Sequence, residues 1–425
     1  MPSPKPPRRP SLRLRVLLLG IGLLLATGTA ELLLHALPGL LPTWFRERYP
    51  HHGIELRYPG IFDRTPLDAV PLPYQVDPYA GPPPHDLVDY GIAPASAASV
   101  DLTHTPHLVL PADRDGLPNT ERHAQTDVVL VGDSFLVYGS QQEPAGLQRT
   151  LAEGLSTHVC NLGISGLGPL HERWMLQNVG LPQRPKLVLW FFFGGNDVLD
   201  ATYYAIWQAQ GTTTLGQLFA AERAPRLLLP AMLGALLGKP PTKALLPEPV
   251  APFPSTTGSW QAWFHPDYLR LASIDAAALV QGPGWLLSTQ VLQQAAAAAA
   301  AQDARFVVVY VPSKEQVHLG HVTIDAAVLA RCVAASNLTV LAVPNEPAAL
   351  QAAVLANRGA VEAQLRAFCA KQGIAWWSAT PVLEELAARG GSGFYTTDTH
   401  WHGAGQRAVG KALVEFVRAQ GLLGK

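Results

Sequence analysis

Cysteine is scarce in this sequence. Only three of its 425 residues are cysteine, namely Cys160, Cys332 and Cys369. No two of them form a CxxC pair, and three scattered cysteines allow at most one disulfide, which excludes a small disulfide-stabilised fold. Cys160 lies within an apolar stretch, so we interpret it as a small buried hydrophobic side chain and not as a reactive thiol.

The chain also lacks a net charge of either sign. It has 31 Lys and Arg residues against 32 Asp and Glu residues, for a net charge of −1. This balance gives no electrostatic attraction to a phosphate backbone, so we expect no nucleic-acid partner. No glycine-rich phosphate loop precedes a lysine, which argues against a nucleotide cofactor. With 48% hydrophobic residues, the chain can bury the core of one large α/β domain with extensions, or of two modest domains.

One long hydrophobic run lies near the N-terminus. Residues 1–15 contain five basic residues, residues 16–30 contain no charge, and apolar character resumes after Glu31. The run is long enough to cross a bilayer, and its positive flank places the N-terminus in the cytoplasm. We therefore expect a cytoplasmic basic segment and a transmembrane signal-anchor helix over residues 16–37. A signal peptide cleaved after the small residues 28–30 is the alternative. Both place the rest of the chain in the periplasm or at the cell surface.

The rest of the sequence divides by composition. Residues 38–126 are rich in proline, which disfavours long helices and central strands, so we expect a membrane-proximal extension. Over residues 127–420, short apolar runs alternate with segments of helical composition. This alternation predicts a three-layer α/β/α fold with a doubly wound parallel sheet of about five strands. The expected strands are 128–131, 157–162, 187–193, 306–311 and 374–377, and the expected helices are 146–154, 170–179, 285–303, 348–371, 381–389 and 404–420.

A large insertion interrupts this alternation at about residues 200–284. An insertion of that length beside a site usually shapes access to it. Its apolar stretch 227–237 is interpreted as a buried insertion helix, with contact to a membrane or an acyl chain as the alternative.

Polar residues follow three of the expected strands. Gly132-Asp133-Ser134 follows the first, residues 161–166 follow the second, and Gly195-Asn196-Asp197 follows the third. Residues 397–405, which contain an Asp and two His, open the last expected helix. Because the carboxyl ends of parallel strands share one edge of a sheet, we expect these segments to meet there.

The residues in these segments are those that acyl transfer needs. A serine hydroxyl needs an imidazole to take its proton, and the imidazole needs a carboxylate to orient it. Ser134, His400 and Asp398 fit these catalytic roles. The negative charge of the tetrahedral intermediate needs fixed donors, and the backbone N–H groups of Ser134 and Gly166 and the side-chain amide of Asn196 fit that oxyanion hole.

In this order, the four segments resemble blocks I, II, III and V of the SGNH/GDSL hydrolases. The resemblance covers roughly residues 127–420, with the insertion unmatched, and it implies ester chemistry through a Ser134 acyl-enzyme. One feature departs from the family: the acid usually precedes the histidine by three residues, whereas Asp398 precedes His400 by two. His400 is preferred to His402 because Gly405 follows His400 at the interval that the family shows.

Residues 398–401, of the form Asp-x-His-Trp, also resemble the membrane-bound bacterial SGNH proteins related to alginate O-acetyltransferases, as does Pro312-Ser313-Lys314. We therefore expect a serine esterase acting on acyl esters, with a glycan or a lipid as candidate substrates. An O-acyltransferase that acetylates a cell-envelope polysaccharide is the first alternative. A catalytically inactive carbohydrate-binding or assembly protein is the second, and the displaced acid favours it.

A metal site is the remaining alternative for the C-terminal segment. Asp398, His400 and His402 are possible metal ligands. No other cluster completes such a site, and a metal would leave Ser134 and Asn196 without a role. We therefore expect neither a metal nor a cofactor.

Overall fold

In the computed structural model the chain forms two compact units. One unit comprises residues 1–63 and 219–242, and the other comprises residues 64–218 and 243–425. The described residues are 11–36, 67–70, 108–110, 113, 117–120, 123, 125–140, 146–164, 168–209, 229, 253–258, 261–336, 343–394 and 399–424. Two of the expected site residues, Gly166 and Asp398, lie outside the described residues, and so does stretch 227–237 apart from Leu229.

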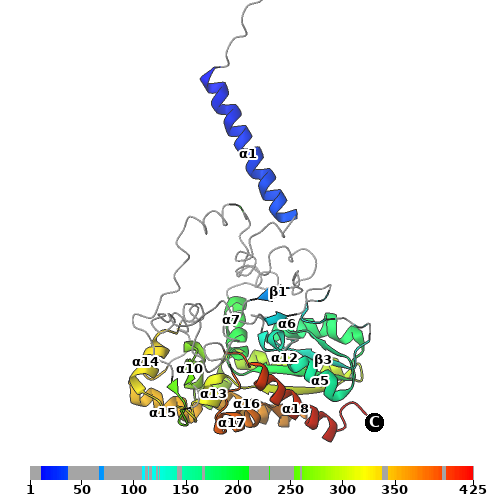
Figure 1. The fold of residues 1–425 in the computed structure, drawn as a ribbon, viewed down its shortest axis with the longest axis vertical. Coiled ribbons are helices and arrows are strands. Elements are labelled where there is room, and N and C mark those ends of the chain that lie inside the picture. Colours follow the sequence, from blue (N-terminus) through cyan, green and yellow to red (C-terminus); the bar gives the residue numbers. More distant parts are fainter. Residues whose placement is uncertain are drawn as a thin grey trace, which may run out of the picture. The chain divides into compact units, whose positions relative to one another are not determined.

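The first unit contains one long apolar helix, α1 (Leu12–Ala36) (Figure 1). Its segment Leu12–Leu34 has a mean hydropathy of 2.0, and most of its described side chains are exposed, although Leu34 near its end is buried. A helix of this length and composition can serve as a signal sequence or as a membrane anchor. Near its end, Glu31 Oε2 accepts a hydrogen bond from the backbone N–H of Leu229 at 2.9 Å. The insertion therefore contacts the helix at its only acidic residue.

The second unit is built around a five-stranded parallel sheet. The sheet has the order β4-β3-β5-β8-β9, and all of its pairings are parallel. The strands are β3 (Val128–Val131), β4 (Val159–Asn161), β5 (Leu187–Phe193), β8 (Arg305–Val311) and β9 (Ala375–Ser378). The predicted parallel sheet of about five strands is thus confirmed. The chain order reverses on either side of β3, and such a reversal opens a crevice at the carboxyl ends of the two strands beside it.

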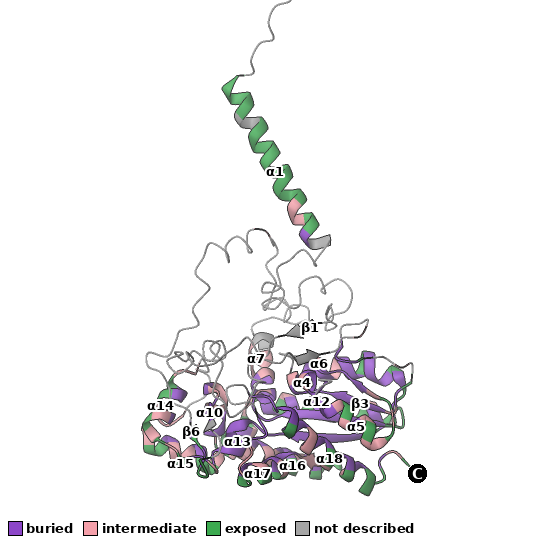
Figure 2. Cartoon of the chain, in the orientation of Figure 1, coloured by how far each residue is buried: buried purple, intermediate pink, exposed green. Residues whose placement is uncertain are grey.

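The central strands β3, β5 and β8 form where they do because their apolar side chains are buried on both faces of the sheet. Every residue of β3 and β5 is buried, and the strands at the centre of the sheet are purple in Figure 2. Alternate residues of β5, such as Leu189 and Phe191, join one core cluster, whereas Trp190 and Phe192 face the opposite layer. Both Phe191 and Trp190 are at most 1% exposed. Replacing either with alanine should cost about 3–5 kcal/mol of unfolding free energy.

Helices cover both faces of the sheet, as the doubly wound prediction requires (Figure 1). On one face, α5 (Leu147–Leu155) packs against α18 (Gly403–Ala419), and α17 (Thr380–Ala388) packs beside α18. On the other, α6 (Pro169–Met175) packs against α12 (Pro283–Ala300). The remaining helices of the described chain are α4 (Ser134–Gly139), α7 (Asp197–Ala209), α10 (Pro266–Ala272), α11 (Ala276–Gln281), α13 (Lys314–His318), α14 (Ala326–Ala334), α15 (Pro347–Asn357) and α16 (Ala360–Gln372), with one π-helical turn (Leu176–Gly180) and one 3₁₀ turn (Leu181–Gln183).

The long helix expected over residues 348–371 is wrong as a single element. It is two helices, α15 and α16, which separate at Arg358-Gly359. Gly359 precedes the first turn of α16 with φ −98° and ψ 5°. Glycine is a poor helix former because its backbone loses more conformational entropy on ordering, so the break falls there.

The insertion also has structure of its own among the described residues. It contains most of α7, and it forms a two-stranded antiparallel sheet of β6 (Phe253–Pro254) and β7 (Gln261–Ala262), followed by α10 and α11. A further antiparallel pair, β1 (Leu67–Val70) with β2 (Leu108–Leu110), lies in the proline-rich extension.

Candidate active site

Ser134 stands at the carboxyl end of β3, at the start of α4. The helix begins there because Asp133 caps it: Asp133 Oδ1 accepts a hydrogen bond from the backbone N–H of Phe135 at 3.0 Å. An Asp at this position satisfies a helix N–H that would otherwise lack a partner. Ser134 is half-buried, and it lies at the edge of the sheet where the strand order predicts a crevice.

His400 reaches Ser134 from the far end of the chain. Its Nε2 lies 2.7 Å from Ser134 Oγ, although the two residues are 266 positions apart. That separation is within the range in which an imidazole takes a proton from a hydroxyl. The structure therefore brings together two of the residues predicted for the site, and it does so through the nitrogen that a general base would use.

The segment that carries His400 is held at its base by backbone contacts. Phe394 and Trp401 form an antiparallel bridge, and the His402 N–H donates to Gly393 O at 3.2 Å. Gly393 has φ +73°, and a Cβ on Gly405 would overlap the carbonyl of Gly393. The positive φ therefore favours glycine at position 393, and the close approach of helix and loop requires glycine at position 405.

Unlike His400, which pairs with Ser134, His402 caps a helix. It caps α18, because its Nδ1 accepts the backbone N–H of Ala404 at 3.1 Å. Burial lowers the pKa of His402 to about 4, and the nearby Arg407 adds to the effect. His402 is thus neutral near pH 7, and its capping nitrogen is already engaged.

A second buried histidine supports the same loop from α13. His318 Nε2 lies 2.7 Å from the carbonyl oxygen of Ser392. Because a carbonyl only accepts hydrogen bonds, the Nε2–H must be the donor. Burial lowers the pKa of His318 to about 3, which keeps the ring neutral, and the hydrogen bond to Ser392 then determines which nitrogen carries the proton. The segment with Pro312-Ser313-Lys314 therefore continues into a helix that braces the His400 loop.

Asn196 occupies the turn after β5, the strand next to β3 in the sheet. It is half-buried and directly precedes α7. Its amide lies close enough to the Asp133 carboxylate to lower the pKa of that group. The turn is tied to β5 because Asp197 Oδ2 accepts the backbone N–H of Phe193 at 2.9 Å. Asn196 is therefore held at the same edge of the sheet as Ser134.

Three carboxyl groups are buried beneath this edge. Asp133, Glu172 and Asp197 are each at most 2% exposed. Burial raises the pKa of Asp133 to about 6, against the opposing effects of the Phe135 N–H, His400 and Asn196. Burial, and then repulsion from neighbouring carboxylates, raises the pKa of Glu172 and of Asp197 well above the usual values. The cluster therefore carries less negative charge at neutral pH than its composition suggests.

The described chain offers no alternative metal centre. It contains no group of three or more His, Cys, Asp or Glu side chains arranged to hold a metal ion. The predicted oxyanion donor Gly166 and the predicted acid Asp398 lie outside the described residues, so their contacts with Ser134 and His400 stay predictions.

Two further residues organise the site, and sequence reasoning missed them. Asn161 Nδ2 donates to Leu136 O at 2.7 Å, and Asn161 Oδ1 accepts the Gly163 N–H at 2.8 Å, so Asn161 links α4 to the loop after β4. Tyr138 stacks on His400 with a ring separation of 4.0 Å. A polar residue that ends an apolar run signals Asn161, whereas nothing local to Tyr138 predicts its contact.

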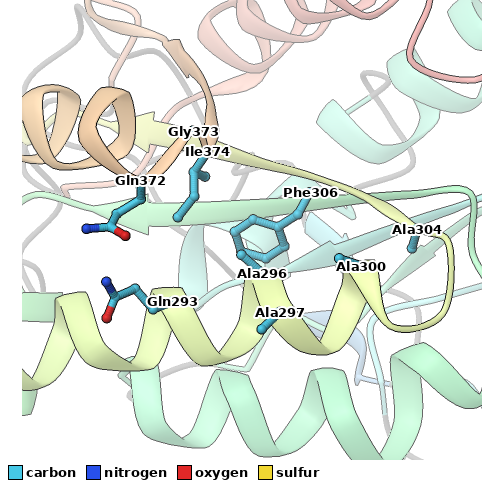
Figure 3. A pocket seen from close by; sticks show the side chains of 9 residues that line it. All are labelled: Gln293, Ala296, Ala297, Ala300, Ala304, Phe306, Gln372, Gly373 and Ile374. Carbon is cyan, nitrogen blue, oxygen red and sulfur yellow. The ribbon is translucent and has the colours of Figure 1, made fainter.

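The pocket in Figure 3 lies elsewhere on the second unit. Its lining comes from α12 and from the residues that lead into β8 and β9, at the amino ends of those strands. It is lined by Gln293, Ala296, Ala297, Ala300, Ala304, Phe306, Gln372, Gly373 and Ile374. None of these side chains titrates, and none is among the predicted site residues.

Comparison with known proteins gives distant structural likenesses only. No family model and no curated protein matches the chain. It is similar to a lipase/acylhydrolase from Enterococcus faecalis, with 10% identity and a TM-score of 0.31 over 69% of this chain and 95% of that chain. It is similar to an extracellular lipase from Streptomyces rimosus, with 14% identity and a TM-score of 0.31 over 68% of this chain and 99% of that chain. A GDSL-like lipase from Bacteroides thetaiotaomicron has 11% identity and a TM-score of 0.30, over 69% of this chain and 87% of that chain. Likenesses at this level do not identify a family, so the function rests on the geometry of the described residues.

Proposed function

We propose that this chain is a serine esterase of the SGNH type that acts on acyl esters outside the cytoplasm. The observation that carries the proposal is the 2.7 Å approach of His400 Nε2 to Ser134 Oγ at the carboxyl edge of a parallel sheet. A hydroxyl and an imidazole from opposite ends of a domain, paired in this way beside an amide, are what acyl transfer needs.

In the first half of the reaction, His400 accepts the Ser134 proton while Oγ attacks the carbonyl carbon of the ester. Asp398 is proposed to orient the imidazole and to support its positive charge. The alcohol then leaves with the proton returned by His400, and the acyl group stays on Ser134 as an ester. In the second half, His400 takes a proton from water, which attacks the acyl-enzyme and regenerates the free serine.

The charge that develops on the carbonyl oxygen needs donors that are already in place. The proposed donors are the backbone N–H of Ser134, the side-chain amide of Asn196 and the backbone N–H of Gly166. Asn196 supports this role because its amide carries two N–H groups. One can be oriented by the Asp133 carboxylate beside it, and the other then remains for substrate.

The apolar helix α1 gives the proposed location. With the basic residues before it in the cytoplasm, the esterase domain lies in the periplasm or at the cell surface, whether the helix is retained as an anchor or cleaved as a signal. We favour an anchor because the helix continues past Glu31 to Ala36. The substrate proposed for such a domain is an acyl ester of an envelope glycan or lipid.

Turnover of p-nitrophenyl acetate by the full chain tests the proposal. Wild type should release acetate to water, and Ser134→Ala should not. Ser140→Ala is the matched control, because Ser140 is a buried serine that follows the same helix and its hydroxyl donates to the carbonyl oxygen of Val137 at 2.7 Å. Its activity should stay within about twofold of wild type.

The same assay separates the alternatives when an envelope polysaccharide is added. If acetyl release becomes acceptor-dependent and the acetyl group appears on the glycan, the chain is an O-acyltransferase. If folded wild type neither turns over the ester nor reacts with a fluorophosphonate at Ser134, a binding or assembly protein that keeps the fold is the better account.

A further inference from the structure

We propose that Tyr138 is a positioning residue for His400, which holds the imidazole by ring stacking and favours the charged form that arises during acyl transfer. Its kinetic consequence rests on the esterase function proposed above, whereas the stacking itself does not. Neither Tyr138 nor its contact belongs to the serine, histidine, acid and oxyanion set derived from the sequence.

The contact is close and nearly parallel. The ring centroids of Tyr138 and His400 are 4.0 Å apart, and the two ring planes differ by only 6°. Phe135 lies 4.9 Å from the same imidazole but is tilted by 48°. Phe135 is also a core residue, since it contacts Phe193 at 4.5 Å. Tyr138 is half-buried, and its parallel ring covers one face of the imidazole.

The short helix α4 explains how one segment contacts both the Nε2 edge and the face of the imidazole. Ser134 and Tyr138 are four residues apart, so they lie on the same face of the helix one turn from each other. Ser134 meets the Nε2 edge of the ring, and Tyr138 meets its face. The hydroxyl and the stacking ring therefore move together relative to His400.

A second contact fixes the distance between α4 and the His400 loop. Gln406 Nε2 donates to the carbonyl oxygen of Tyr138 at 3.2 Å and to that of Trp401 at 2.8 Å. Gln406 is 1% exposed. It thus joins the backbone of the stacking residue to the backbone of the residue that follows His400.

Stacking restricts a rotation of the imidazole that hydrogen bonds at the ring edge do not restrict. The χ2 torsion of histidine is broad, so a ring held only at its edge can rock about that axis. A parallel tyrosine ring at van der Waals distance removes this freedom. When the imidazole becomes positively charged, the negative face of the tyrosine ring also attracts it, an effect of about 0.5–2 kcal/mol in proteins. Both effects act more on the transition state than on the resting enzyme.

Steady-state kinetics on the full chain test the proposal. Tyr138→Leu should lower kcat for p-nitrophenyl acetate about tenfold, which is ~1.4 kcal/mol of transition-state stabilisation, with KM changed by less than twofold. Tyr138→Met fills similar space without a ring and guards against a fold defect in the leucine variant. Tyr138→Phe keeps the ring and should retain kcat within about twofold. Phe416→Leu is the matched control, because it removes an aromatic contact with Trp377 at 6.5 Å, away from the site.

A spectroscopic readout keeps the proposal testable if the esterase function fails. The NMR signals of the His400 ring protons can be assigned by their loss in His400→Gln. The Tyr138 ring current should displace their chemical shifts in wild type, and the phenylalanine ring should do the same in Tyr138→Phe. The chemical shifts should move away from the wild-type values in Tyr138→Leu and Tyr138→Met. An unmoved signal in both ringless variants would overturn the stacking. If wild type is active, then kcat unchanged in both ringless variants, or lost equally in Tyr138→Phe, would overturn the positioning role. An inactive wild type with a displaced signal would instead reject the esterase and retain the stacking.

Discussion

The two ends of the sheet in the second unit differ in kind. At the amino ends of β8 and β9, an open pocket is lined mainly by alanine and glutamine (Figure 3). At the carboxyl ends of β3 and β5, buried Asp133 and Asp197 lie near Ser134 and His400. The first end has a hollow without reactive groups, and the second has reactive groups held in place by burial and hydrogen bonds. Buried titratable groups beside a paired hydroxyl and imidazole are a stronger sign of a site than a concave surface alone.

The largest effect expected from this comparison is the loss of the base. His400→Gln should reduce kcat by about 10⁴-fold or more, because the serine hydroxyl then has no proton acceptor. His402→Asn is the control, since asparagine also caps helices and His402 already spends its Nδ1 on the cap of α18. If kcat falls equally in both variants, the assignment of His400 as the base and of His402 as a helix cap is wrong.

The next effect concerns the donor on the neighbouring strand. Asn196→Ala should lower kcat by about 10²–10³-fold, which is typical for the loss of one oxyanion donor. KM should change little, because the donor acts when charge develops on the carbonyl oxygen. If Asn196→Ala instead raises KM and leaves kcat intact, Asn196 binds the ground state of the substrate and is not an oxyanion donor.

A smaller effect is expected in stability, from the buried Asp133. Its pKa is raised from 3.8 to about 6, so the native state binds the proton more tightly than the unfolded state does. Ionised Asp133 therefore destabilises the fold above about pH 6, and the penalty disappears as the pH falls toward 4. The full shift corresponds to about 3 kcal/mol, as an order of magnitude.

Asp133→Asn should flatten this pH dependence, because asparagine can keep the cap on the Phe135 N–H without a charge. Denaturant unfolding of wild type and variant at pH 5 and pH 8 measures it. The variant should gain stability relative to wild type at pH 8 and about half as much at pH 5, because pH 5 lies midway between the two pKa values. An equal difference at the two pH values would show that Asp133 does not carry the effect.

The smallest effect is expected at the opposite end of the sheet. Ala296→Leu partly fills the pocket in Figure 3 and should leave kcat/KM within about twofold of wild type, with unfolding free energy changed by no more than about 1 kcal/mol. A large loss of activity in this variant would show that the two ends of the sheet are coupled, and it would break the comparison.

The sheet could be predicted from the sequence because its strands are continuous apolar runs. The predicted runs 128–131 and 187–193 coincide with β3 and β5. A strand that is buried on both faces contains no polar residues, so its first and last residues can be read from the sequence. Helices α4 and α7 were not predicted. Helix α4 is only six residues long, and α7 begins inside the Gly-Asn-Asp turn and continues into the insertion. The Gly-Asn-Asp sequence is typical of a turn, so it did not predict the start of a helix.

The candidate site was predictable in part for a similar reason. Ser134 and Asn196 directly follow buried strands, so their place at one edge follows from the rule for parallel sheets. The contacts of Tyr138 with His400 and with Gln406 depend on how segments more than 250 residues apart pack. No periodicity or spacing encodes that packing. Asp398 and Gly166 lie outside the described residues and stay predictions.

Covalent trapping of the nucleophile tests the central proposal most directly. Full-length protein would be treated with a fluorophosphonate, digested and analysed by mass spectrometry to locate the adduct. We predict one phosphonylated residue, Ser134, with the reaction greatly slowed in His400→Gln and unchanged in His402→Asn. Folded wild-type protein that carries no adduct, or an adduct on a different residue, would contradict the assignment of Ser134 and His400 as nucleophile and base.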